Sequence, residues 1–163
     1  MKTYLLALEI DRFEIGLGYR TLPLHCTLMP WFILSGSHEA TDRLTGFVEH
    51  ICSAYPSPRL NVYGDSMFGR SFDIPVHLVT KTAVLMGLHR AVFSAVKEMG
   101  AQVPDEEWAG DGYRPHIAII EENTPGLHEE IITSRLVLIE KLSFIAPKNK
   151  FVRHASNFKG RAH

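Results

Sequence analysis

Two histidines in short apolar runs are the residues of this chain with the clearest potential for chemistry. His25 opens the run HCTL, and His116 opens the run HIAI about half a chain length later. Histidine has an unperturbed pKa of about 6.5, so near neutral pH one imidazole accepts a proton while another donates one. Two such side chains that meet at one site predict acid–base catalysis.

Strand geometry decides which neighbours of these histidines share their surface. Alternate side chains of a strand lie on the same face, so Thr27 is expected beside His25 and Ala118 beside His116. Cys26 then points into the core, which argues against a thiol–imidazole nucleophile. Taken singly, each histidine fits an ordinary structural residue; taken as a pair in similar settings, they favour a functional site.

The two runs resemble the paired His-x-Thr/Ser-x motifs of the 2H phosphoesterase superfamily, which includes 2′-5′ RNA ligase-like proteins and cyclic phosphodiesterases. Pro115 before His116 agrees with that pattern, and the expected order of helices and strands matches over nearly the whole chain. The resemblance implies an α+β, bilobal fold in which two mainly antiparallel sheets face each other across a central cleft. Helices would lie outside, and residues 1–163 would form a single domain of two similar lobes related by a pseudo-twofold repeat.

The resemblance also implies the activity. It is hydrolysis of a 2′,3′-cyclic phosphate or 2′-5′ phosphodiester on RNA ends or nucleotides, with His25, Thr27 and His116 as catalytic residues. No metal and no cofactor would be needed, and the leaving oxygen would be the 3′ one. Ligation of RNA ends at 2′-5′ linkages is the reverse reaction at the same residues, and the sequence does not separate the two directions.

Ala118 departs from the superfamily pattern, which has Thr or Ser there. One hydroxyl that would hold phosphate oxygens is missing, so we expect reduced activity. The substrate-binding residues would then be Ala118 itself, Arg114 as a replacement donor and Tyr113 as an aromatic contact; Arg114 alternatively is an ordinary surface arginine. A second interpretation is a weak or inactive protein that uses the same site to bind a nucleotide or RNA end.

The expected elements place the histidines on strands. Apolar patterning and turn residues predict two helices and seven strands. The helices are Ser37–Tyr55 and Thr82–Met99, with Gly100 at the C-cap of the second. The strands are Tyr4–Ile10, Leu24–Leu34, Arg59–Phe68, Ile74–Thr80, Tyr113–Glu121, Arg135–Ala146 and Phe151–Phe158. Asp11–Pro23 and Gln102–Gly112 are expected to be loops, and Gly126–Ile132 a loop or short helix.

Composition bounds the class of protein. Of the 163 residues, 45% are hydrophobic and 21% charged, and the formal net charge of −1 gives no general attraction to nucleic acid or membranes. Two cysteines give neither a disulfide framework nor a metal-binding spacing. We therefore expect a cytoplasmic monomer whose partner is a nucleotide or RNA terminus, with no membrane association and no metal.

Overall fold

A computed structural model of the chain describes residues 1–119, 129–143 and 147–159. The helices are α1 (His38–Ala54) and α2 (Ala83–Glu98). The described strands are β1 (Lys2–Glu9), β2 (Gly18–Tyr19), β3 (His25–Leu34), β4 (Arg59–Phe68), β5 (Ile74–Val79), β6 (His116–Ala118), β7 (Glu130–Ile132), β8 (Arg135–Lys141) and β9 (Lys150–Asn157). Two short 3-10 helices, η1 (Glu106–Trp108) and η2 (Gly110–Gly112), lie between α2 and β6.

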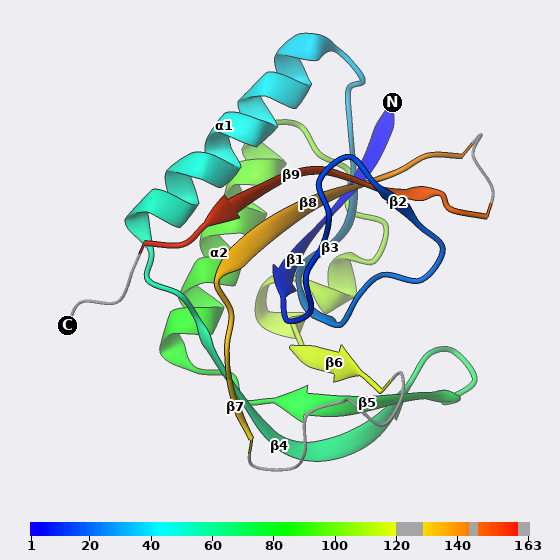
Figure 1. Ribbon diagram of the computed structural model, residues 1–163, viewed down its shortest axis with the longest axis vertical. Coiled ribbons are helices and arrows are strands. Elements are labelled where there is room, and N and C mark those ends of the chain that lie inside the picture. Colours follow the sequence, from blue (N-terminus) through cyan, green and yellow to red (C-terminus); the bar gives the residue numbers. More distant parts are fainter. Residues whose placement is uncertain (120–128, 144–146, 160–163) are drawn as a thin grey trace.

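The described strands form one 9-stranded sheet in the order β2-β9-β8-β1-β3-β6-β5-β4-β7. Each pairing between these strands is antiparallel, so the α+β class and the antiparallel sheet are confirmed. The sequence predicted two sheets, whereas the described strands are continuous through β3 and β6. This junction is narrow, because the register of β3 with β6 consists of Cys26 opposite Ile117. In Figure 1, β4, β5 and β7 lie below it and β1, β8 and β9 above it.

Both predicted helices are confirmed, and their ends have the expected chemistry. Ser37 Oγ accepts a hydrogen bond from the Ala40 N–H, and Thr82 Oγ1 accepts one from the Leu85 N–H, so each predicted first residue is the N-cap. The second helix ends at Glu98 with Met99 as its C-cap, and the next residue, Gly100, has a φ of +87°, a left-handed conformation that favours glycine.

Strand boundaries differ from the prediction mainly around β6. The expected strand Tyr113–Glu121 is reduced to three residues, His116–Ala118, in the described part of the chain. Pro115 lacks an N–H and cannot extend the ladder, which explains the late start. Residues 120 and 121 lie outside the described residues, as do 144–146 of the predicted strand Arg135–Ala146; β8 ends at Lys141.

Two short strands were not predicted. β2 lies within the expected loop Asp11–Pro23, and β7 lies within Gly126–Ile132, of which 126–128 are outside the described residues. Strands of two or three residues show no measurable hydrophobic period, so patterning alone does not reveal them.

One face of the sheet packs on both helices. The buried cluster on this face contains residues of α1, α2 and the strands β1, β3, β4, β5, β6 and β8. Its central strand residues include Leu6, Cys26, Leu28, Ile117 and Leu138. Because this face is filled, a site for a polar ligand must lie on the other face.

The opposite face is covered over β1, β8 and β9 by the segment between β1 and β3. Phe13 and Leu22 of this segment join Leu5, Ala7, Val137, Ile139 and Val152 in a second buried cluster. Gly18 and Tyr19 pair with β9, which fixes the covering segment to the edge of the sheet.

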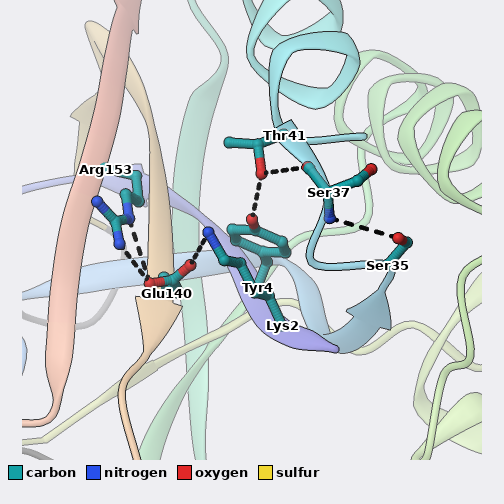
Figure 2. Close-up of polar contacts among 7 residues, drawn as sticks. All are labelled: Lys2, Tyr4, Ser35, Ser37, Thr41, Glu140 and Arg153. Carbon is teal, nitrogen blue, oxygen red and sulfur yellow. Dashed lines mark hydrogen bonds and ion pairs between the residues drawn. The ribbon is translucent and has the colours of Figure 1, made fainter. Parts of the chain in front are cut away.

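At the start of α1 a polar network ties the helix to β1 (Figure 2). The Tyr4 hydroxyl hydrogen bonds the Thr41 hydroxyl, which donates to the Ser37 carbonyl oxygen. Nearby, Glu140 of β8 accepts hydrogen bonds from the Arg153 guanidinium and lies 3.5 Å from Lys2 Nζ. Within the described residues no helix is long and apolar enough to cross a membrane.

Candidate active site

His25 is the first residue of β3 and lies on the sheet face opposite the helices. Side chains alternate along β3, so that Cys26 and Leu28 are fully buried in the helix-side cluster while His25 and Thr27 are partly exposed. His25 Nδ1 lies 2.8 Å from the carbonyl oxygen of Pro23. A carbonyl only accepts, so Nδ1 carries the proton and Nε2 of the neutral ring is left to accept one.

His116 makes the same contact on the neighbouring strand. It is the first residue of β6, and its Nδ1 lies 2.7 Å from the carbonyl oxygen of Arg114. The ring is therefore the same tautomer as His25, again with an unprotonated Nε2 that has no hydrogen-bond partner within the described residues. Each imidazole is oriented by the carbonyl two residues before it.

The β3–β6 register brings the four motif positions together. Cys26 lies opposite Ile117 in an antiparallel pair, so alternation puts Thr27 opposite His116 and His25 opposite Ala118. All four side chains share the face away from the helices. His25 and His116 are therefore diagonal neighbours across the two strands. The Cα atoms of such neighbours are typically about 7–8 Å apart.

The electrostatics of the pair agree with this proximity. Burial lowers the pKa of His25, the Pro23 hydrogen bond opposes the shift, and the nearby His116 lowers the pKa further. Burial also lowers the pKa of His116, against the hydrogen bond to Arg114, and the Arg114 charge adds to the lowering. Both rings are thus biased toward the neutral form.

Aromatic rings support each imidazole from a different element. The Phe13 ring, fully buried, contacts the His25 ring edge-on with centroids 5.9 Å apart. Phe68, the last residue of β4, packs on His116 with centroids 4.5 Å apart and also contacts Trp108. Each ring therefore has a hydrophobic neighbour that limits its rotation.

Arg114 lies at this site and Tyr113 lies behind it. The Arg114 side chain is exposed, and its guanidinium carbon lies 4.6 Å from the centroid of Phe68, the ring that packs on His116. Tyr113 is 3% exposed and belongs to the helix-side cluster, where its hydroxyl donates to the Thr27 carbonyl oxygen. The predicted substrate contact of Tyr113 does not fit this burial; the residue instead holds β3 against the segment that leads into His116.

Tyr113 is itself held by His89 of α2. The two rings stack with centroids 3.9 Å apart, and His89 Nδ1 donates to the Leu28 carbonyl oxygen while Nε2 accepts from the Gly110 N–H. Both nitrogens of this buried ring are satisfied, so it is a structural histidine.

Cys26 has no part in proton transfer. Its side chain is fully buried on the helix side, and this burial raises the pKa of its thiol to about 12. The expectation that Cys26 and His25 lie on opposite faces is confirmed. Among the residues that the structure describes, no group of three or more His, Cys, Asp or Glu side chains is arranged to hold a metal ion.

Sequence reasoning missed the groups that orient the histidines. Loop segments supply the Pro23 and Arg114 carbonyl oxygens that accept from the two imidazoles. Phe13, which contacts His25, is held in turn by Glu9 and Arg135, two residues that are far apart along the chain. The carbonyl contacts had a weak signal in the prolines beside each histidine. Glu9 and Arg135 had none, because only the sheet topology brings β1 and β8 together.

Comparison of the fold with solved structures returns a phosphoesterase and LigT. A structure described as a phosphoesterase has a TM-score of 0.65 and 16% identity, and the match covers 97% of this chain and 98% of that one. LigT of E. coli in complex with NADP⁺ has a TM-score of 0.64 and 16% identity over the same shares. LigT in complex with 3′-AMP has a TM-score of 0.61 and 13% identity, again over 97% and 98%. The sequence matches no protein-family model and no curated protein. The predicted resemblance is confirmed as a likeness of fold over nearly the whole chain.

Proposed function

We propose that this protein is a metal-independent phosphodiesterase that hydrolyses a 2′,3′-cyclic phosphate or a 2′-5′ phosphodiester on nucleotides or RNA ends. His25 and His116 are its acid–base pair. The observation that carries the proposal is the matched pair of imidazoles on one sheet face, each with Nδ1 on a backbone carbonyl oxygen and with no hydrogen-bond partner of Nε2 among the described residues. The likeness of fold to phosphoesterase structures supports the same reaction class.

The chemistry follows from two positioned imidazoles. The neutral ring takes a proton from a water molecule through Nε2 as the water oxygen bonds to phosphorus. The bond from phosphorus to the 3′ oxygen breaks, and the charged ring gives its proton to that oxygen, which leaves a 2′-phosphate. Each positioned acid or base contributes about 10²–10⁴-fold to the rate.

Phosphate oxygens are held by the groups around the pair. The Thr27 hydroxyl, on the same face as His25 and opposite His116, donates to one non-bridging oxygen, where charge accumulates in the transition state. Ala118 offers no hydroxyl on the other side. Arg114 takes that role, because its guanidinium already lies beside the ring that packs on His116 and its fork geometry suits phosphate.

Nucleotides are the ligand class that we propose. The related LigT structures are complexes with NADP⁺ and 3′-AMP, two ligands built from nucleotides with phosphate groups. The proposal extends this class to the present chain, as a monomer in the cytoplasm. It also retains the predicted division of the fold into two halves, each of which supplies one histidine motif.

One observation favours a second candidate function. With Ala118 in the second motif, the site retains both imidazoles but has one fewer phosphate-binding hydroxyl than the superfamily pattern. A protein that binds a nucleotide or RNA end without turnover would tolerate this loss. The two candidates differ in a single measurable property, which is release of product.

The test is hydrolysis of 2′,3′-cyclic nucleotides in the presence of a chelator, with 2′- and 3′-phosphate products resolved. We expect the wild type to form the 2′-phosphate, and His25→Ala and His116→Ala each to lose about 10²–10⁴-fold in kcat. His154→Ala is the matched control, because His154 lies on β9 next to Glu49 of α1 and away from the pair. Nucleotide binding without product would favour the binding protein, and activity that survives both histidine variants would overturn the acid–base pair.

A further inference from the structure

A buried cluster of Glu9, Arg135 and Phe13 lies next to His25 and takes no part in the proposed reaction. Glu9 is the last residue of β1 and lies directly opposite His25 in the β1–β3 register. Glu9 and Arg135 are each 6% exposed, and Phe13 is fully buried. Burial of an ion pair costs desolvation energy, so its presence beside the proposed catalytic ring calls for a reason beyond stability.

The hydrogen bonds of the cluster close on Phe13. Arg135 Nε donates to Glu9 Oε1 at 2.9 Å, and Arg135 Nη2 donates to Glu9 Oε2. The same Nη2 donates to the Phe13 carbonyl oxygen at 2.6 Å, and the Phe13 N–H donates to Glu9 Oε2 at 2.8 Å. Both backbone groups of Phe13 are therefore held by the ion pair, and the Phe13 ring contacts His25.

Glu9 does not act on His25 as a direct hydrogen-bond partner. His25 Nδ1 is occupied by the Pro23 carbonyl oxygen, and the carboxylate oxygens of Glu9 are occupied by Arg135 and Phe13. Burial would raise the pKa of Glu9, but the hydrogen bonds from Arg135 and Phe13 outweigh burial and lower it. The carboxylate is thus charged and neutralised by its own partner.

We propose that Glu9 and Arg135 are positioning residues: together they clamp Phe13 against the His25 ring and keep a neutral ion pair beside it. The inference rests on the proposed function of His25 and goes beyond it, since it assigns a role to residues of β1 and β8. Because Glu9 and Arg135 neutralise each other, they present no unpaired charge to His25. Because they hold the backbone of Phe13, the Phe13 ring keeps the His25 ring in the orientation that points Nε2 away from Pro23.

Several charged and titratable groups around His25 can shift its titration, and a test must distinguish the effect of Glu9 and Arg135 from that of the others. His116 faces it from β6 and Glu9 lies opposite it on β1; Arg135 of β8 pairs with Glu9, and Tyr19 packs on Phe13. In the covering segment, Arg12 acts on Glu9 and Glu14 acts on Arg135. Neutralising one member of the pair exposes His25 to the other, so the two single variants should shift its titration in opposite directions.

The experiment is NMR titration of the His25 ring, with kcat and KM, in Glu9→Gln and Arg135→Gln. We expect the His25 midpoint to fall in Glu9→Gln, which leaves a cation, and to rise in Arg135→Gln, which leaves an anion. In both variants kcat should drop about ten- to a hundred-fold with little change in KM, because small misplacement of a catalytic group is costly. Midpoints that do not separate in opposite directions, or an unchanged kcat, would overturn the inference.

Glu140→Gln is the matched control. Glu140 is also a buried glutamate paired with an arginine of a neighbouring strand, but it lies at the other end of β8 from Arg135, beside Lys2 and Tyr4 (Figure 2). It should change neither the titration of His25 nor kcat. An equal effect of Glu140→Gln would show that loss of any buried pair suffices, which overturns a specific role for Glu9.

Two further variants keep the inference testable if a single variant does not fold. The double variant Glu9→Gln/Arg135→Gln removes both charges and retains hydrogen-bonding groups; its His25 midpoint should return near the wild-type value while kcat stays low. Phe13→Leu leaves the ion pair intact and should lower kcat alone. The NMR titration needs no turnover. If the wild type does not hydrolyse, the proposed function is overturned, while the midpoints of the two single variants still decide the electrostatic role of the Glu9–Arg135 pair.

Discussion

The two histidines use one backbone contact in two different settings. His25 opens the ten-residue strand β3, where Thr27 follows it and the buried Phe13 packs on its ring. His116 opens the three-residue strand β6, where Ala118 follows it and its neighbours, Phe68 and Arg114, come from the end of β4 and from a partly exposed segment. The imidazole contacts are matched, while the surrounding groups are not.

This difference separates what the proposed reaction requires from what tunes it. The proposed reaction needs a fixed tautomer with an unprotonated Nε2 at both histidines. Each has it through a carbonyl oxygen that accepts from Nδ1, at 2.8 Å for His25 and 2.7 Å for His116. The Thr27 hydroxyl of β3, which we propose binds phosphate, has no counterpart at Ala118 of β6. The β3 side should therefore hold the phosphate, and the β6 side should be the one that tolerates change.

The largest effect that tests this comparison is loss of the remaining hydroxyl. Thr27→Ala should lower kcat about ten- to 150-fold, because a hydrogen bond to a charged group is worth about 1.5–3 kcal/mol. Thr27→Ser, which keeps the hydroxyl, is the control and should retain most of the activity. The measurement is steady-state hydrolysis of a 2′,3′-cyclic nucleotide; an inert Thr27→Ala would show that the hydroxyl does not contact phosphate.

The pH dependence of kcat/KM tests whether the surroundings of His25 and of His116 both lower the pKa of the imidazole. Burial lowers the pKa of both His25 and His116 below the ordinary value of 6.5, so the charged acid is lost before neutral pH. We expect kcat/KM to decline about tenfold per pH unit on the alkaline side, with its optimum below 6.5. Thr27→Ala should lower kcat/KM by the same factor at every pH and leave the pH of the optimum unchanged. An optimum above pH 7.5 would contradict the lowered pKa values of the two histidines.

The same shifts have a consequence for stability with a definite sign. A histidine whose pKa is lower in the folded state binds fewer protons there than in the unfolded chain. The free energy of unfolding is then highest above about pH 6.5 and falls as the pH drops toward the folded-state values. Denaturant titrations of the wild type and of His25→Gln at pH 5 and pH 7.5 measure it; the variant should lose less stability on acidification.

The sequence predicted the features that depend on neighbouring residues and missed those that depend on contacts between distant segments. Alternation within each strand predicted that Thr27 shares a face with His25 and that Ala118 shares one with His116, because it is a local property. The β3–β6 junction, which joins the halves into one sheet, depends on a single residue pair and left no pattern. The burial of Tyr113 depends on its stack with His89, a contact between α2 and the segment before β6. Glu9 and Arg135 likewise meet only in the folded sheet.

A gain of function on the β6 side would sharpen the comparison further. Ala118→Thr restores the superfamily pattern at a position opposite His25 and paired with Val76 of β5. We expect kcat to rise about two- to tenfold, the value of a typical net hydrogen bond, since the surrounding groups have not been shaped for a second hydroxyl. Ala118→Val adds a similar volume without the hydroxyl and is the control; an equal rise with valine would point to packing instead.

The smallest expected effect concerns Arg114, the proposed substitute for the missing hydroxyl. Its guanidinium is exposed and lies on Phe68, so its interaction with a bound phosphate is partly screened by water. Arg114→Gln should lower kcat/KM about two- to fivefold at low salt and less at high salt, because exposed charges are worth about 0.2–1 kcal/mol. Arg114→Gln should also matter less in the Ala118→Thr background, where the new hydroxyl takes over the same oxygen, so the double-variant cycle decides whether the two groups serve one phosphate. Additive effects would place Arg114 on another part of the substrate and leave the β6 side without a phosphate donor of its own.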